Sequence, residues 1–182
     1  TRGRFPKVKL GKKVPKKAEA LLIAAFKGDD GLELPGTTLL EGAALRSTYE
    51  ALIAVGATGK TGEVTRVPAP AKAGVASIIA VGLGDAEEVD DETLRRAAGQ
   101  AARSITKIDA VATSLGDFGV APVVEGLILG GYKYSGLRSE SAAASTTYTV
   151  VAGKSSQEDF DNAKITAESV LIARDLVNTP SN

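Results

Sequence analysis

The stretch that decides the fold is residues 75–105, VASIIAVGLGDAEEVDDETLRRAAGQAARSI. It opens with an apolar run from Val75 to Val81, which is long enough for a buried strand and is closed by a glycine turn. Asp90 follows and can cap a helix, within which apolar residues recur every three or four positions. Strand, tight turn and amphipathic helix form the repeating unit of an α/β domain.

The same alternation continues on both sides of this stretch. Segments rich in β-branched and aliphatic residues predict strands near 5–10, 20–26, 63–68, 75–81, 108–113 and 146–152. Ala-rich segments with helical periodicity predict helices near 39–54, 91–105, 122–132 and 156–177. A chain of 182 residues with 43% hydrophobic content can build one core, so we predict a single α/β domain.

The chain contains no cysteine and no histidine. This excludes disulfides, thiolate nucleophiles and sulfur-based metal sites, and it removes the commonest general base and metal ligand. The close carboxylate pairs, such as Asp29 with Asp30 and Asp90 with Asp91, fall in predicted loops or helix starts. We therefore assign no catalytic residue and no metal or cofactor ligand to this chain.

Basic residues gather at the start of the chain. Residues 1–17 hold eight Lys or Arg and no acid, whereas the remaining residues hold 14 basic and 22 acidic side chains. Clustered cations could bind DNA electrostatically. However, Phe5, Val8 and Leu10 alternate with the basic residues, so an edge strand with a lysine-rich outer face is the favoured interpretation.

The segment Ala54-Val55-Gly56-Ala57-Thr58-Gly59-Lys60-Thr61 satisfies a relaxed phosphate-loop pattern. A true phosphate loop is followed by a helix whose free N–H groups hold the phosphate. The residues after Thr61 are β-branched or proline and favour a strand. A glycine-rich turn between a helix and a strand is therefore favoured over a nucleotide site at Lys60.

The turn Gly82-Leu83-Gly84 carries the first two glycines of a dinucleotide fingerprint. The sixth position of that fingerprint is Glu87, where glycine or alanine is expected. Acidic side chains here would also repel a pyrophosphate. A tight strand-to-helix turn is the favoured interpretation.

No apolar run approaches the roughly 20 residues that span a bilayer, and the first residues lack the apolar core of a secretory signal. We therefore expect a cytoplasmic protein without membrane contact. The chain starts with Thr and contains no Met, from which we expect the native start to be missing.

The last predicted helix ends in a specific motif. Ala173-Arg174-Asp175-Leu176-Val177-Asn178-Thr179-Pro180-Ser181-Asn182 resembles the segment that joins the N-terminal and catalytic domains of the leucyl aminopeptidase (cytosol aminopeptidase) family. Residues 81–99 and 125–134 are similar to the same family, the second through its Gly-Tyr-x-Tyr ending. Pro180 restricts Thr179, so the helix should end near Asn178.

The resemblance implies a mixed β-sheet flanked by helices, similar to macro domains. Residues 1–154 would form the N-terminal non-catalytic domain, and residues 155–182 would form a connector helix to an absent C-terminal peptidase domain. Arg174 and Asp175 would fix the domain junction by ion pairing.

The resemblance also implies what the parent protein does. It would be a homo-hexameric exopeptidase that removes N-terminal residues, preferably leucine, from peptides with two divalent metal ions, usually manganese or zinc. The metal ligands would lie beyond Asn182. This domain would serve assembly and regulation, with DNA binding through the basic segment or macro-like nucleotide binding as alternatives.

Overall fold

One mixed β-sheet organises the molecule. A computed structural model describes residues 3–35, 39–134, 145–152 and 157–178. The strands are β1 (Lys7–Gly11), β2 (Ala20–Gly28), β3 (Gly31–Glu33), β4 (Val64–Pro68), β5 (Ser77–Gly82), β6 (Ala110–Thr113) and β7 (Thr147–Val151). The helices are α1 (Gly42–Ala54), α2 (Asp91–Ser104), α3 (Val120–Gly130) and α4 (Gln157–Asn178), with 3-10 turns η1 (Ala86–Glu88) and η2 (Leu115–Asp117).

The strands follow the order β1-β7-β6-β2-β5-β4, and the short β3 pairs with the end of β2. Neighbouring strands run parallel except for β4 on β5 and β3 on β2. The strand β2 lies in the middle, and its first seven residues are all buried. A strand buried on both faces reads as a continuous apolar run, which is why ALLIAAF carries no alternation.

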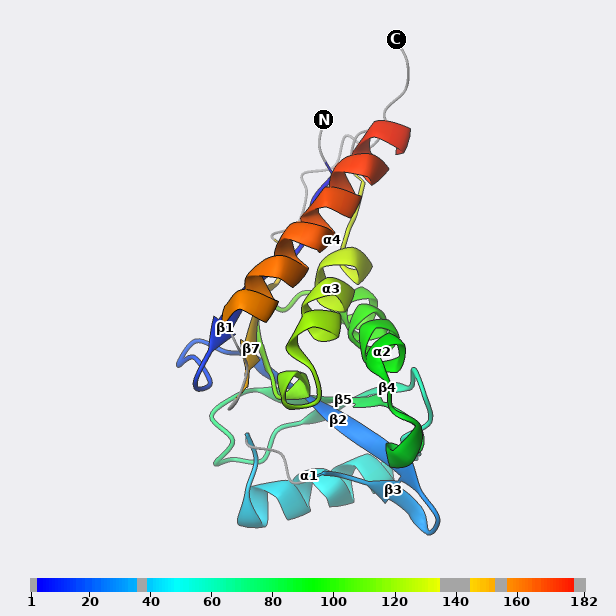
Figure 1. The fold of residues 1–182 in the computed structure, drawn as a ribbon. Coiled ribbons are helices and arrows are strands. Elements are labelled where there is room, and N and C mark those ends of the chain that lie inside the picture. Colours follow the sequence, from blue (N-terminus) through cyan, green and yellow to red (C-terminus); the bar gives the residue numbers. More distant parts are fainter. Residues whose placement is uncertain (1–2, 36–38, 135–144, 153–156, 179–182) are drawn as a thin grey trace.

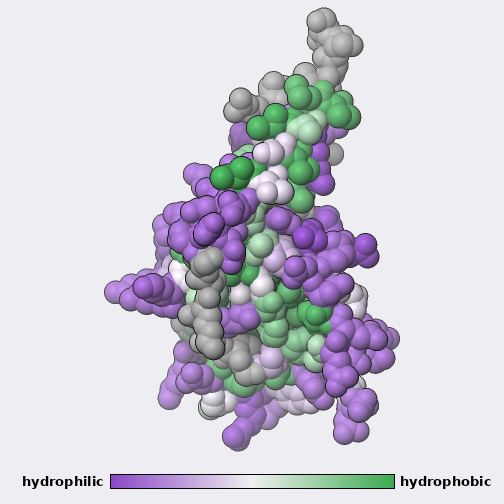
Figure 2. Space-filling view, viewed as in Figure 1, coloured by the Kyte–Doolittle hydropathy of each residue, from purple (hydrophilic) through white to green (hydrophobic). Residues whose placement is uncertain are grey.

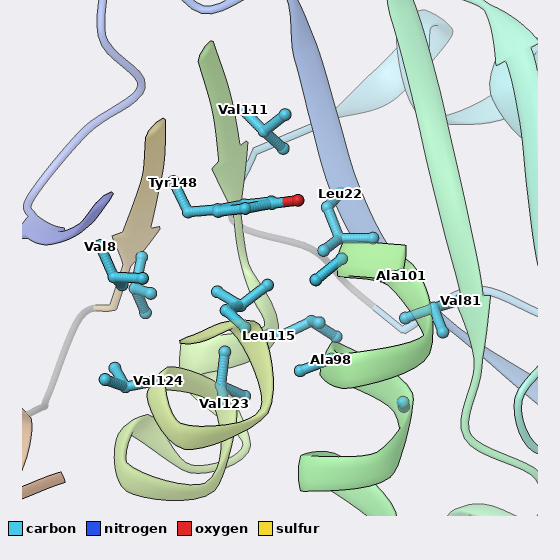
Figure 3. Packing of buried hydrophobic residues seen from close by; sticks show 14 of the residues in the cluster. Val8, Leu22, Val81, Ala98, Ala101, Val111, Leu115, Val123, Val124 and Tyr148 are labelled. Carbon is cyan, nitrogen blue, oxygen red and sulfur yellow. The ribbon is translucent and has the colours of Figure 1, made fainter. Parts of the chain in front are cut away.

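Two hydrophobic layers cover the two faces of the sheet. Alternate residues of β2 point to opposite sides, so Leu22 joins the layer beneath α2, α3 and α4, while Leu21 and Ile23 join the layer beneath α1. Figure 1 shows α1 on the side of the sheet away from the other three helices. In the larger layer, Tyr148 of β7 lies with Leu22 and Leu115 against the alanines of α2 (Figure 3).

The fold class and the expected helices are confirmed, with boundaries shifted by a few residues. The helix α2 starts as predicted, because the Asp90 carboxylate accepts a hydrogen bond from the Thr93 N–H at 2.7 Å. The sequence did not predict β3 or the two 3-10 turns. The edge-strand interpretation of the basic segment is confirmed, since β1 ends the sheet with Val8 buried and Lys7 and Lys9 exposed.

The helices α2 and α3 cross at glycine. A Cβ atom on Gly126 would lie 2.8 Å from the Ala98 Cβ and closer still to the Arg95 carbonyl oxygen, while one on Gly130 would collide with the backbone of Gly99. These glycines let the two helix backbones approach closely. The loss of helix propensity at each glycine, about 1 kcal/mol relative to alanine, is the cost of that contact.

We predict that Gly126→Ala destabilises the protein by about 1–3 kcal/mol, because overpacking at this crossing outweighs the gain in helix propensity. Urea unfolding monitored by circular dichroism measures the change. The matched control is Ser47→Ala at an exposed position of α1, which should leave stability unchanged or slightly raised. A neutral or stabilising Gly126→Ala would contradict the close-packed crossing.

Candidate functional site

The connector motif forms the last turns of α4. Ala173 to Asn178 are helical, up to the last residue that the structure describes, so the predicted end of the helix near Asn178 stays a prediction. Thr179 and Pro180 lie outside the described residues. Figure 1 shows this end of α4 extending beyond the sheet, close to the N-terminal part of the chain.

The Asp175 carboxylate joins three distant segments. Its Oδ1 atom accepts hydrogen bonds from the Gly3 N–H and from the Tyr132 hydroxyl, both at 2.7 Å. The Asn178 side-chain amide donates to the same hydroxyl at 3.4 Å. Desolvation and the neighbouring carboxylate raise the pKa of Tyr132, so the phenol stays protonated as a donor. The end of α4 is thereby tied both to the end of α3 and to the start of the chain.

Arg174 makes a second tie to α3. Its Nη1 atom donates to the Leu129 carbonyl at 3.0 Å, and its guanidinium carbon lies 5.8 Å from the centre of the Tyr132 ring. Leu129 belongs to the last turn of α3, where carbonyl groups lack helical partners and the helix dipole favours a cation. Arg174 and Asp175 thus position the helix. Their ion pairing with another domain stays a prediction.

Two faces of α4 are apolar. The inner face is packed into the core through Phe160, Ala163, Ala167 and Leu171. On the outer face Ile165, Ile172 and Leu176 are 64%, 60% and 74% exposed, and Val177 is 85% exposed. Spacings of seven and four residues place Ile165, Ile172 and Leu176 on one stripe. Figure 2 shows hydrophobic side chains gathered along the far part of this helix.

The phosphate-loop pattern is a turn between α1 and β4, as favoured from the sequence. The Glu63 carboxylate accepts hydrogen bonds from the Thr58 N–H at 2.8 Å, the Thr58 hydroxyl at 3.1 Å and the Gly59 N–H at 2.7 Å. A side-chain anion therefore occupies donors that a phosphate would require. This arrangement favours a structural role over nucleotide binding at Lys60.

The second glycine motif packs against the first. The Gly84 N–H donates to the Gly59 carbonyl at 3.0 Å, and the Gly62 N–H donates to the Gly82 carbonyl at 2.9 Å. A Cβ on Gly82 would collide with the Lys60 carbonyl oxygen. The backbones of the two motifs therefore pack directly against each other. Their glycines permit this close approach because they carry no side chain.

Within the described residues, no group of three or more Asp or Glu side chains is placed to hold a metal ion. No helix of this part of the chain is long and apolar enough to cross a membrane.

These features define an α/β domain that carries a projecting terminal helix with an uncovered apolar face. The family model described as "Cytosol aminopeptidase family, N-terminal domain" matches residues 22–141. The chain belongs to the cytosol aminopeptidase family and contains its N-terminal domain, as the connector motif indicated.

Curated relatives extend the match over the whole chain. A "Probable cytosol aminopeptidase" of Corynebacterium diphtheriae is 45% identical over 99% of this chain, and one of Corynebacterium glutamicum is 47% identical over 100% of it. The chain spans 37% of the length of each. A similar protein of Rhodococcus erythropolis is 38% identical over 96% of the chain and is also matched over 37% of its length.

Solved structures share the fold. A tomato leucine aminopeptidase mutant superposes with a TM-score of 0.70 at 20% identity, over 99% of this chain and 40% of its own. The "Bottromycin maturation enzyme BotP" superposes with a TM-score of 0.63 at 25% identity, over 90% of this chain and 33% of its own. A second structure of that enzyme is described as a complex with Mn.

We predict that Tyr132→Phe loosens the end of α4, because it removes the donor to Asp175 and leaves a charged acceptor short of one partner. The local opening free energy of residues 172–178 should fall by about 1–3 kcal/mol. Hydrogen–deuterium exchange measures it. Tyr49→Phe, at an exposed tyrosine on α1, is the matched control and should leave the exchange of α4 unchanged. Equal exchange in both variants would contradict the tie.

Proposed function

We propose that this chain is the domain through which an aminopeptidase positions its catalytic part, serving assembly and regulation rather than chemistry. The observation that carries the proposal is the outer apolar stripe of α4, Ile165, Ile172 and Leu176, on a chain that spans 37% of its relatives' length. Exposed apolar stripes of this kind mark contact surfaces. The relatives are longer than this chain, and we propose that their additional length contains a C-terminal catalytic domain that packs on this stripe.

The parent protein would then be a hydrolase that removes N-terminal residues, preferably leucine, from peptides. The names of the relatives and of the tomato structure support this activity, and the word "cytosol" in the names of the relatives supports a cytoplasmic location. We further propose that residues 1–154 form the domain body, that residues 155–182 form the connector, and that the parent assembles as a homo-hexamer.

The parent would bind two divalent metal ions, manganese or zinc, for which the Mn complex of a structural neighbour offers support. The residues of this chain do not fit such a site. It has no histidine or cysteine, and its described carboxylates do not gather in a group of three. We therefore place the metal ligands, and every catalytic group, in the C-terminal part of the parent.

We predict that the purified chain leaves leucine p-nitroanilide intact, even with added manganese, because its described residues hold no converging group of metal ligands and its sequence has no histidine to act as a general base. Release of p-nitroaniline is read by absorbance, with a full-length cytosol aminopeptidase as the positive control. Turnover that follows the chain through every purification step would overturn the proposed division of labour.

We also predict that Ile172→Glu combined with Leu176→Glu weakens docking of the C-terminal domain in the full-length parent, since both substitutions bury carboxylates in an apolar contact. The variant should lose roughly tenfold or more in resistance to proteolysis near the connector. Thr166→Glu, another exposed position of α4 outside the stripe, is the matched control and should behave like the wild type. If the double variant matches that control, the stripe is not the docking surface.

A further inference from the structure

The helix α1 carries a second uncovered apolar face, on the opposite side of the sheet from α4. Leu45, Tyr49 and Ile53 recur every fourth residue; Leu45 is half-buried, and Tyr49 and Ile53 are 39% and 44% exposed. Thr48 and Leu52, on the inner side of the same helix, are fully buried. Leu45 also packs against the hydrophobic layer beneath α1, whereas Tyr49 and Ile53 lie outside that layer.

A groove of about 550 Å³ runs beside this face, between α1 and the short strand β3. Leu32 and Leu34 contribute apolar lining from the strand side, and Leu45 and Tyr49 do so from the helix side. One anion and one cation, Glu33 and Arg46, also line it. A scattered apolar residue on a surface is ordinary, but a stripe beside an apolar groove is typical of a contact surface.

The charges on this face suit a second copy of the same chain. Arg46 and Glu50 are both exposed and lie about one helical turn apart on α1. Thr48 is midway between them along the helix. Within the described part of the chain, neither side chain forms an ion pair. A two-fold axis perpendicular to α1 at the level of Thr48 would reverse the helix direction, so that Arg46 of each copy would meet Glu50 of the other in two ion pairs.

We propose that the α1 face, defined as Leu45, Tyr49 and Ile53 with the adjoining groove, is a two-fold contact between copies of this chain. Tyr49 of one copy enters the other copy's groove, between the two Arg46–Glu50 pairs. A helix of 13 residues is about 20 Å long, so the contact is smaller than a standard interface and the dimer of the chain alone is weak.

Sedimentation velocity of the chain from micromolar to near-millimolar concentration tests the proposal. We expect a monomer–dimer equilibrium that Tyr49→Glu weakens by roughly tenfold or more, as expected for a central aromatic residue. Circular dichroism establishes that the variant is folded. Thr166→Glu, at an exposed position of α4 outside its apolar stripe, is the matched control, and its dimerisation should equal that of the wild type.

A charge exchange tests the symmetry without touching the core. Arg46→Glu and Glu50→Arg should each weaken association, because like charges then meet twice across the axis. The double variant R46E/E50R restores opposite charges and should return association to within roughly threefold of the wild type. A monomer at every concentration, a dimer lost in the α4 control but kept in Tyr49→Glu, or a double variant no better than the single ones would each overturn the proposal.

Discussion

The close contact between α2 and α3 is the constraint on which the rest of the helical layer depends. Gly126 and Gly130 allow the two backbones to touch, and the Arg95 Nε atom adds an ion pair to Glu125 at 2.6 Å. This contact fixes α3 on the sheet, and α4 packs in turn on α3 through its inner face. Gly126 and Gly130 therefore help to set the direction of α4, although they lie roughly 50 residues before its last described residue.

The end of α3 converts that packing into a defined junction. Its last carbonyl groups need donors, and Arg174 supplies one at Leu129, while Tyr132 just beyond the helix donates to Asp175. Gly3 donates to the same carboxylate, so both ends of the described chain meet at one polar centre. The Asp175 carboxylate, with its two hydrogen-bond donors, helps to hold this end of α4 in place. The exposed apolar side chains nearby do not, because they are not buried against the rest of the domain.

The periodicity of apolar residues predicted most helices and strands, because these elements are long enough to show a pattern of buried and exposed positions. The two layers follow from the Ala-rich stripe of α2 and the continuous apolar run of β2, both visible in the sequence. The strand β3 was missed because three residues carry no periodic signal. The Asp175 centre could not be predicted in detail, since Gly3 and Asp175 are separated by 172 positions and only the tertiary fold brings them together. The connector motif predicted where the site would be. Its hydrogen-bond partners, Gly3 and Tyr132, could not be predicted, because no sequence pattern links them to Asp175.

The sheet separates the two uncovered faces of the domain. The outer stripe of α4 belongs to the helical layer above the sheet, and the α1 face belongs to the layer below it. The two proposed contacts therefore use surfaces on opposite sides of the sheet. The sequence contains no histidine or cysteine, and the two glycine motifs, one similar to a phosphate loop and one to a dinucleotide fingerprint, hydrogen-bond to each other. The two proposed contacts lie on α1 and α4, two outer helices that the sheet holds on opposite sides of the domain.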